Sequence, residues 1–186
     1  MSMELLAAPH LTGPTGFFTP DEGRSAALEH LEDILIALAH IASVDAFQHW
    51  IYVSGEGADA DARDRAWLRI RARFEQGVDW SGLEQERIAR WYRQLHVFLY
   101  PFYYIEYGIA QLGALQIWRN SLEDPGTAVS RYRAALALGG TRPLPDIYHT
   151  AGAALSFDAG LMAELVTLVE DRIEGLRREL PVPDGR

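Results

Sequence analysis

Residues 96–108 read His-Val-Phe-Leu-Tyr-Pro-Phe-Tyr-Tyr-Ile-Glu-Tyr-Gly, so four tyrosines, two phenylalanines and a histidine are crowded into one short stretch. Proline is favoured at the first position of a helix, so Pro101 predicts that a helix begins there. Tyr103 and Tyr107 would then lie one turn apart on the same face, with His96 just before the break. Such a junction can bring together an imidazole, which titrates near neutral pH, and phenols that donate to an oxyanion.

Capping residues and apolar spacing predict helices in the rest of the chain. Residues 19–22 read Thr-Pro-Asp-Glu and residues 81–84 read Ser-Gly-Leu-Glu, and both fit the capping box of a helix N-terminus. No convincing alternation of polar and apolar residues indicates a strand. We therefore predict an all-α fold, a bundle of about seven to eight helices. The predicted helices span residues 20–53, 58–76, 84–95, 101–120, 125–138, 146–151 and 159–180.

The length of the chain, 186 residues, predicts one domain over residues 1–186. Within it we expect a helix end and a loop over 1–18, the bundle over 19–180 and a frayed tail over 181–186. In the helix predicted over 58–76, Trp67, Ile70 and Phe74 face inward, and the arginines of that helix form a solvated face. Gly108 and Gly113 each lower helix stability by about 1 kcal/mol relative to alanine, which close helix packing or close substrate approach would explain.

Composition excludes several classes of function. The chain carries 17 basic and 26 acidic residues, a net charge of −9, which disfavours nucleic acid or an anionic membrane as the main partner. No run reaches the roughly 18 uncharged apolar residues of a membrane span, and the N-terminus lacks the pattern of a signal peptide. The absence of cysteine excludes disulfides and thiolate metal sites. These features predict a cytoplasmic protein.

A catalytic zinc site is not predicted in this chain. The motif H-E-x-x-H, which places two histidines on zinc and a glutamate beside the bound water, does not occur in the sequence. No two of the six histidines are four residues apart, and a catalytic zinc usually needs three protein ligands. On the helix predicted over 20–53, Asp45, Gln48 and His49 could form a polar cluster, for which a structural role is the default.

The stretch from His96 resembles the histidine–tyrosine segment in the catalytic domain of the oligoendopeptidase F and thimet oligopeptidase family of zinc metallopeptidases. There a histidine is followed by Pro-Phe-Tyr and then by a second tyrosine four residues after the first. The matching residues here are His96, 101–103 and Tyr107. In that family these side chains bind the peptide substrate and hydrogen-bond the tetrahedral intermediate.

The resemblance therefore implies that His96 positions a peptide and that Tyr103 and Tyr107 donate hydrogen bonds to the oxyanion. The spacing from the histidine to the tyrosines varies between branches of the family. Tyr100 or Tyr104 could therefore take the place of Tyr103, and we assign both, with His96, to substrate binding.

The resemblance extends along nearly the whole chain. Residues 1–6, Met-Ser-Met-Glu-Leu-Leu, match a segment that in the family follows the glutamate that is the third zinc ligand. Glu4 would then match a carboxylate that steadies a zinc-bound histidine, its alternative being an exposed glutamate near the terminus. Further similar segments are residues 45–52, 78–83, 108–116 and 138–141, together with Tyr132.

This alignment implies that the chain is the C-terminal half of a zincin-like oligopeptidase catalytic domain, truncated just after the metal site. In the complete enzyme, zinc activates a water that attacks a short peptide. The chain alone would hold no metal or other cofactor and would be inactive. Two alternatives stay open: a non-catalytic helical interaction module that self-associates, and one half of a split peptidase that pairs with a separate metal-binding half.

Overall fold

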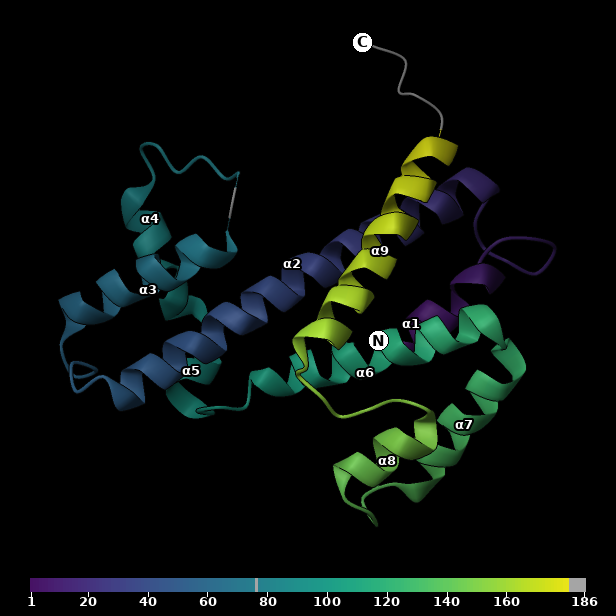
Figure 1. Cartoon of the computed structure of the whole chain (residues 1–186). Coiled ribbons are helices and arrows are strands. Elements are labelled where there is room, and N and C mark those ends of the chain that lie inside the picture. The colour runs from purple at the N-terminus through teal and green to yellow at the C-terminus, as the bar shows by residue number, and fades with distance from the viewer. Residues whose placement is uncertain (76, 181–186) are drawn as a thin grey trace, which may run out of the picture. The chain divides into compact units, whose positions relative to one another are not determined.

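The fold is all-α, as predicted. The computed structural model describes residues 1–75 and 77–180, and this part of the chain contains nine α-helices, two short 3₁₀ turns and no β-strand (Figure 1). Thr12 and Phe18 form an isolated parallel bridge in the loop before the second helix. The tail predicted over 181–186 lies outside the described residues, as does Gln76.

The chain divides into two compact units. Unit 1 comprises Met1–Leu35 and the chain from Ile109 onward, and unit 2 comprises Ile36–Gly108. Two helices contribute to both units: α2 (Pro20–Val53) and α6 (Ile105–Glu123). Unit 1 also contains α1 (Ser2–Ala7), η1 (Ala8–His10), α7 (Pro125–Leu138), α8 (Leu144–Ala151) and α9 (Ala159–Glu179). Unit 2 also contains α3 (Ala60–Phe74), α4 (Glu84–Ala89), η2 (Arg90–Arg93) and α5 (Leu95–Leu99).

The long helix α2 begins at the predicted capping box. The Thr19 backbone N–H donates to Glu22 Oε2 at 2.9 Å, and the Glu22 N–H donates to Thr19 Oγ1 at 3.3 Å. Among the described residues α2 is the one helix that could cross a membrane by length and composition. The sequence analysis did not predict a membrane span here, because it considered only runs of uncharged apolar residues and α2 contains charged residues. Of the most apolar part of α2, 33% is buried. The core helix of a globular protein can have the same length and composition, so these two properties do not show that α2 spans a membrane.

In unit 1, α7 packs against α8, and the two lie side by side in Figure 1. Their contact with α6 forms a small core of Ile117, Ala135 and Ala151. On α7 the apolar spacing predicts an inward face of Val129, Tyr132 and Leu136. This prediction is wrong in part, because Val129 and Leu136 are exposed while Ala128 and Ala135 are buried. In α9, the buried residues are Leu165, Val169, Ile173 and Leu176.

Gly113 of α6 is explained by close packing. A Cβ atom at this position would lie 2.7 Å from the ring of Tyr148, whose hydroxyl donates to the Ile109 carbonyl at 2.8 Å. The ring of Tyr148 thus lies against the backbone of α6. At Gly108, within unit 2, an added Cβ atom would lie 3.2 Å from a methyl group of Ile41, which is a looser contact of the same kind.

We expect Gly113→Ala to destabilise the protein by about 1–3 kcal/mol, since the added methyl overlaps a ring that cannot move without losing its hydrogen bond. This outweighs the gain of about 1 kcal/mol in helix propensity. Gly175→Ala in α9, where no atom lies near the new Cβ, is the matched control and should stabilise. Urea unfolding measures both; a stabilising Gly113→Ala would contradict the packing argument.

The core of unit 2 is aromatic. Phe47 of α2 is fully buried and meets the edges of Trp67 and Trp91, with ring centroids 5.4 and 5.2 Å apart. The indole N–H groups are satisfied, because Trp91 donates to Asp64 at 2.9 Å and Trp67 to the Arg87 carbonyl at 3.3 Å. Buried aromatic rings of this kind contribute large apolar area, and their polar atoms need partners.

Two local predictions in unit 2 are wrong. The 81–84 capping box does not form: Ser81 Oγ donates to Asp79 at 2.7 Å, and α4 begins only at Glu84. The single helix predicted over 84–95 is instead α4, η2 and α5 in succession.

The helix predicted from Pro101 begins at Ile105, because Pro101 belongs to a turn. The next residue, Phe102, has φ of 61°, a left-handed conformation that costs a non-glycine residue about 1–2 kcal/mol. Its ring packs against His49 and Tyr52 of α2, with centroids 5.0 and 5.1 Å away, and these contacts offset that cost.

Candidate functional site

The His96 ring lies among four tyrosine rings in unit 2. Its centroid is 4.8 Å from that of Tyr104, 5.8 Å from Tyr107, and 6.1 Å from both Tyr100 and Tyr103. The Tyr103 ring is parallel to the imidazole, at 4°, whereas the Tyr107 ring is perpendicular to it, at 89°. We call these five residues the histidine–tyrosine cluster.

The cluster opens to solvent through three of its rings. Tyr100, Tyr103 and Tyr107 are 56%, 51% and 38% exposed, so their hydroxyls are accessible to a ligand. Tyr104 is half-buried, and burial raises the pKa of its hydroxyl; the neighbouring Tyr107 adds to this effect and Gln94 partly opposes it. Tyr104 is therefore a protonated phenol throughout the physiological pH range.

Short elements position the histidine. The five-residue helix α5 presents His96 and anchors itself through buried Val97. Gln48 of α2, which is fully buried, donates from Nε2 to the His96 carbonyl at 3.4 Å. Gln48 therefore supports the backbone of His96 and does not join Asp45 and His49, which face each other at 3.6 Å elsewhere on α2.

A polar network continues from His96 into the interior of unit 2. Gln94 Nε2 lies 2.8 Å from His96 Nδ1, and Gln94 Oε1 lies 3.3 Å from His40 Nε2. His40 Nδ1 is in turn 3.4 Å from Nη1 of Arg71, whose side chain is 8% exposed. The sequence-based prediction that the arginines of α3 are all solvated is therefore wrong for Arg71.

A buried carboxylate holds the far end of this network. Glu75 accepts hydrogen bonds from Arg71 at 2.6 Å, from Arg90 at 2.7 Å and from the Trp80 indole at 3.1 Å. Burial by itself raises the pKa of Glu75, but the hydrogen bond from Arg71 and the charges of Arg71 and Arg90 outweigh it and lower the pKa overall. Glu75 is therefore ionised in the folded protein.

His40 is held neutral by its surroundings. Burial lowers its pKa most strongly, the charges of Arg71 and Arg90 lower it further, and the hydrogen bond with Gln94 together with Glu75 opposes them. The edge of the His40 ring also meets Tyr104, with centroids 5.7 Å apart. The imidazole thus connects the ion cluster of α3 with the histidine–tyrosine cluster.

The residues predicted as site residues divide between the units. His96, Tyr100, Tyr103, Tyr104 and Tyr107 lie together in unit 2. Tyr103 lies before α6, so it shares no helix face with Tyr107, although the two rings still meet edge to face at 5.9 Å.

Glu4 lies in unit 1, on α1, and is exposed. Its carboxylate pairs with the amino terminus of Met1 at 2.5 Å, which lowers its pKa, with a weaker contribution from His30.

The described residues do not fit a zinc site. No group of three or more His, Cys, Asp or Glu side chains within 1–75 and 77–180 is arranged to hold a metal ion. Each of the cluster's rings contacts another ring, and the nitrogen His96 Nδ1 faces an amide. Chemistry at a metal would therefore need ligands that these residues do not provide.

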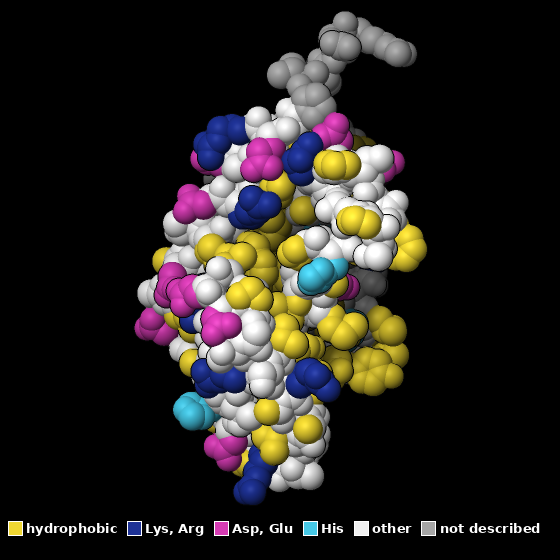
Figure 2. Space-filling view, turned by 90° about the vertical axis from the view of Figure 1, so that its right-hand side faces the viewer, with side chains coloured by type: hydrophobic (Ala, Val, Ile, Leu, Met, Phe, Trp, Pro, Cys, Tyr) yellow, Lys and Arg dark blue, Asp and Glu magenta, His cyan; other side chains and the backbone are white. Residues whose placement is uncertain are grey.

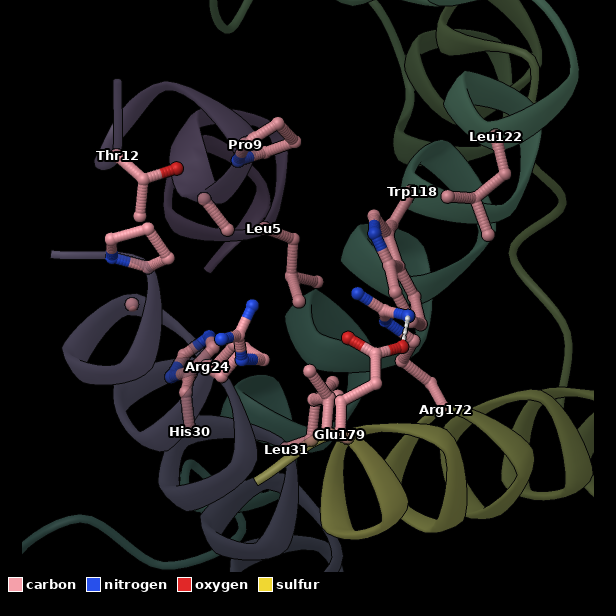
Figure 3. Close-up of a pocket in the computed structure, with 15 residues that line it drawn as sticks. Leu5, Pro9, Thr12, Arg24, His30, Leu31, Trp118, Leu122, Arg172 and Glu179 are labelled. Atoms are coloured by element: carbon pink, nitrogen blue, oxygen red, sulfur yellow. Dashed lines mark ion pairs between the residues drawn. The ribbon is translucent and has the colours of Figure 1, made fainter. Parts of the chain in front are cut away.

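Unit 1 contains a cavity of about 430 Å³ between α1, α2, α6 and α9 (Figure 3). Leu5, Leu31 and Trp118 give it apolar walls, and the side chains of Arg172 and Glu179, 3.9 Å apart, lie at one side. His30 Nε2 is buried without a hydrogen-bond partner in the described chain. The cavity thus combines apolar walls with paired charges.

The family model described as peptidase family M3 matches residues 2–167. This chain belongs to peptidase family M3. It is similar to a solved structure described as PZ peptidase A with inhibitor 2, with a TM-score of 0.82 and 28% identity over 94% of this chain. The M3 chain spans 30% of that structure's length. A search of curated proteins found no match.

Sequence reasoning identified the five rings of this M3 chain but missed Gln94, His40 and Arg71. Gln94 lies two residues before His96, and polar residues that close to a candidate site are worth testing as partners. Arg71 gave no such signal, because a run of arginines on an amphipathic helix predicts a solvated face.

Proposed function

We propose that this M3 chain supplies the peptide-binding and oxyanion-stabilising side chains of a zinc metallopeptidase of the oligoendopeptidase F type that hydrolyses short peptides. The observation that carries the proposal is the histidine–tyrosine cluster, in which exposed phenols surround one imidazole. Tyr103 and Tyr107 would donate to the oxygen that becomes negative in the transition state. His96 would bind the peptide beside them, with Tyr100 and Tyr104 lining the same site.

The zinc chemistry would come from outside this chain. Zinc in the complete enzyme would activate the attacking water, whereas the described residues offer no site for the ion. Phenols that bind the oxyanion and an imidazole that binds the peptide lower a barrier but provide no nucleophile of their own. We therefore propose that the chain by itself is inactive and that activity needs a segment with the H-E-x-x-H motif. A cytoplasmic location belongs to the same proposal.

Two measurements on the full chain test this function. Metal analysis after dialysis against zinc should find no stoichiometric ion, and a quenched peptide should be cleaved no faster than background. A titration with a short unlabelled peptide, followed by NMR, should shift the resonances of the cluster and leave those of unit 1 unchanged. His96→Ala should abolish these shifts. Chelator-sensitive turnover by the chain alone, or peptide shifts outside the cluster, would overturn the proposal.

Exposed apolar residues on α5 support a second candidate, a module that binds another polypeptide. Leu95, Phe98 and Leu99 are 54%, 53% and 59% exposed, an unusual concentration on one short helix. Separately from α5, the space-filling view shows hydrophobic side chains among charged ones on the face that it presents, which is the side of α7 in Figure 1 (Figure 2). Self-association, or pairing with a metal-binding half, would cover such surface. The solution mass separates the cases, since a monomer at high concentration argues against self-association.

A further inference from the structure

We propose that Arg71, His40 and Gln94 form a directional hydrogen-bond relay that fixes the proton of the His96 imidazole on Nε2. His96 would then present an Nε2–H donor to a ligand. The relay concerns the tautomer of this one ring, and only its use toward a peptide rests on the function proposed above.

The direction of the relay is set at its buried end. A guanidinium group donates hydrogen bonds and cannot accept them. Arg71 Nη1 lies 3.4 Å from His40 Nδ1, so this nitrogen must be the acceptor. Arg71 cannot turn away, because Nη2 is bonded to Glu75 at 2.6 Å and Nη1 also contacts Ser43 Oγ at 3.2 Å.

The tautomer of His40 then determines the orientation of the Gln94 amide. A neutral imidazole that accepts at Nδ1 carries its proton on Nε2, and His40 Nε2 lies 3.3 Å from Gln94 Oε1. The low pKa of His40, caused chiefly by burial, agrees with this neutral state. Rotating the Gln94 amide by half a turn would place its NH₂ group against the Nε2–H of His40, two donors facing each other.

Because Gln94 Oε1 accepts from His40, the group of Gln94 that faces His96 is its NH₂ group, a donor. Gln94 Nε2 lies 2.8 Å from His96 Nδ1, so Nδ1 accepts and the ring proton lies on Nε2. Within the described residues no hydrogen bond reaches His96 Nε2, and the hydrogen bond from Gln48 to the His96 carbonyl fixes the backbone. The remaining groups that face the ring are the four tyrosines of the cluster.

An N–H donor at His96 Nε2 suits a peptide carbonyl, which can only accept. It would act beside the phenol donors of Tyr103 and Tyr107, so that several donors converge on acceptor atoms of the ligand. Gln94, His40 and Arg71 are thus positioning residues that act through His96.

Imidazole ¹⁵N NMR on the full chain tests the relay without any ligand. At about pH 8 an ordinary histidine is neutral, so the spectrum reports the tautomer. The wild-type His96 should show a non-protonated Nδ1 and a protonated Nε2, with the preferred tautomer favoured about tenfold or more, as for one ordinary hydrogen bond. A mixed population in wild type, or a proton on Nδ1, would overturn the relay.

Gln94→Glu should reverse the tautomer, because a carboxylate can only accept and the His96 proton must then lie on Nδ1. Gln94→Met keeps the shape without polar atoms and should relax His96 toward a mixture. Arg71→Met should change the spectrum of His40. Arg73→Met, exposed on the same helix, is the matched control and should change neither ring.

An unchanged His96 spectrum in folded Gln94→Glu would overturn the relay, and circular dichroism confirms folding. If this variant does not fold, Gln94→Met decides: a spectrum identical to wild type would refute the relay. The expected tautomer without any peptide shift would retain the relay and refute the proposed function; peptide shifts with a mixed tautomer would do the opposite.

Discussion

Glu75→Gln is expected to lower the free energy of unfolding by about 3 kcal/mol. The substitution leaves Arg71, with a side chain 8% exposed, inside unit 2 without its counter-ion. Removing one partner of a buried ion pair costs about 3–5 kcal/mol, and we expect the lower end because Arg90 and Arg87 are 39% and 29% exposed. Urea unfolding followed by circular dichroism measures the change.

The same carboxylate makes stability depend on pH, with a definite sign. The folded pKa of Glu75 lies below its ordinary value of 4.5, so as pH falls the unfolded chain takes up the proton first. Stability from Glu75 is therefore complete above about 4.5 and is lost as pH falls toward the folded pKa. His40, whose folded pKa is also lowered, adds a loss that begins near its ordinary value of 6.5.

Glu75→Gln should reduce the loss of stability in the carboxylate range, because it removes the contribution of Glu75, and should retain the loss that begins near neutrality. Glu86→Gln, exposed on α4, is the matched control and should change stability by no more than about 0.5 kcal/mol. Equal effects of the two substitutions would mean that the buried ion cluster does not stabilise unit 2.

Tyr107→Phe is expected to lower kcat by about two to three orders of magnitude in an active peptidase assembled from this chain and an M3 segment with the H-E-x-x-H motif. In the proposed function the Tyr107 phenol donates to charge that develops only in the transition state, so KM should change little. Tyr107 is accessible, at 38% exposed, and the substitution deletes a single oxygen, so the fold should persist.

Tyr52→Phe provides the matched control, because Tyr52 is 58% exposed on α2 and lies outside the histidine–tyrosine cluster. Its kcat should equal that of wild type. An increase in KM with kcat unchanged for Tyr107→Phe would instead assign this phenol to uniform peptide binding rather than to the oxyanion.

Much of the fold could be predicted because local chemistry decides it. The capping box at Thr19 and the Asp124 cap, which accepts from the Thr127 N–H at 3.0 Å, mark helix starts that the structure confirms. Burial followed less well from sequence. Leu136 is exposed although it fits an apolar stripe, because the small residues Ala128 and Ala135 fill the close contact instead.

The sequence allowed a prediction of which aromatic side chains gather at the candidate site, but not of the backbone conformation and contacts that position them. Pro101 is a sound helix start by local rules, yet the chain continues through Phe102 in a left-handed conformation that no local rule assigns to phenylalanine. The contacts of its ring with His49 and Tyr52 offset the energetic cost of that conformation. The inward position of Arg71 likewise depends on Ser43 of α2, and on Glu75 at the end of its own helix.

The stacking of Trp91 on Phe98 has a practical consequence. These rings lie 5.5 Å apart at 18°, and Phe98 belongs to the same short helix as His96. Any ligand that displaces α5 must therefore change the surroundings of an indole that is otherwise only 4% exposed. Tryptophan fluorescence should therefore report such a displacement without an attached dye, and the part of the change that Trp91→Phe removes belongs to Trp91 among the five tryptophans of the chain.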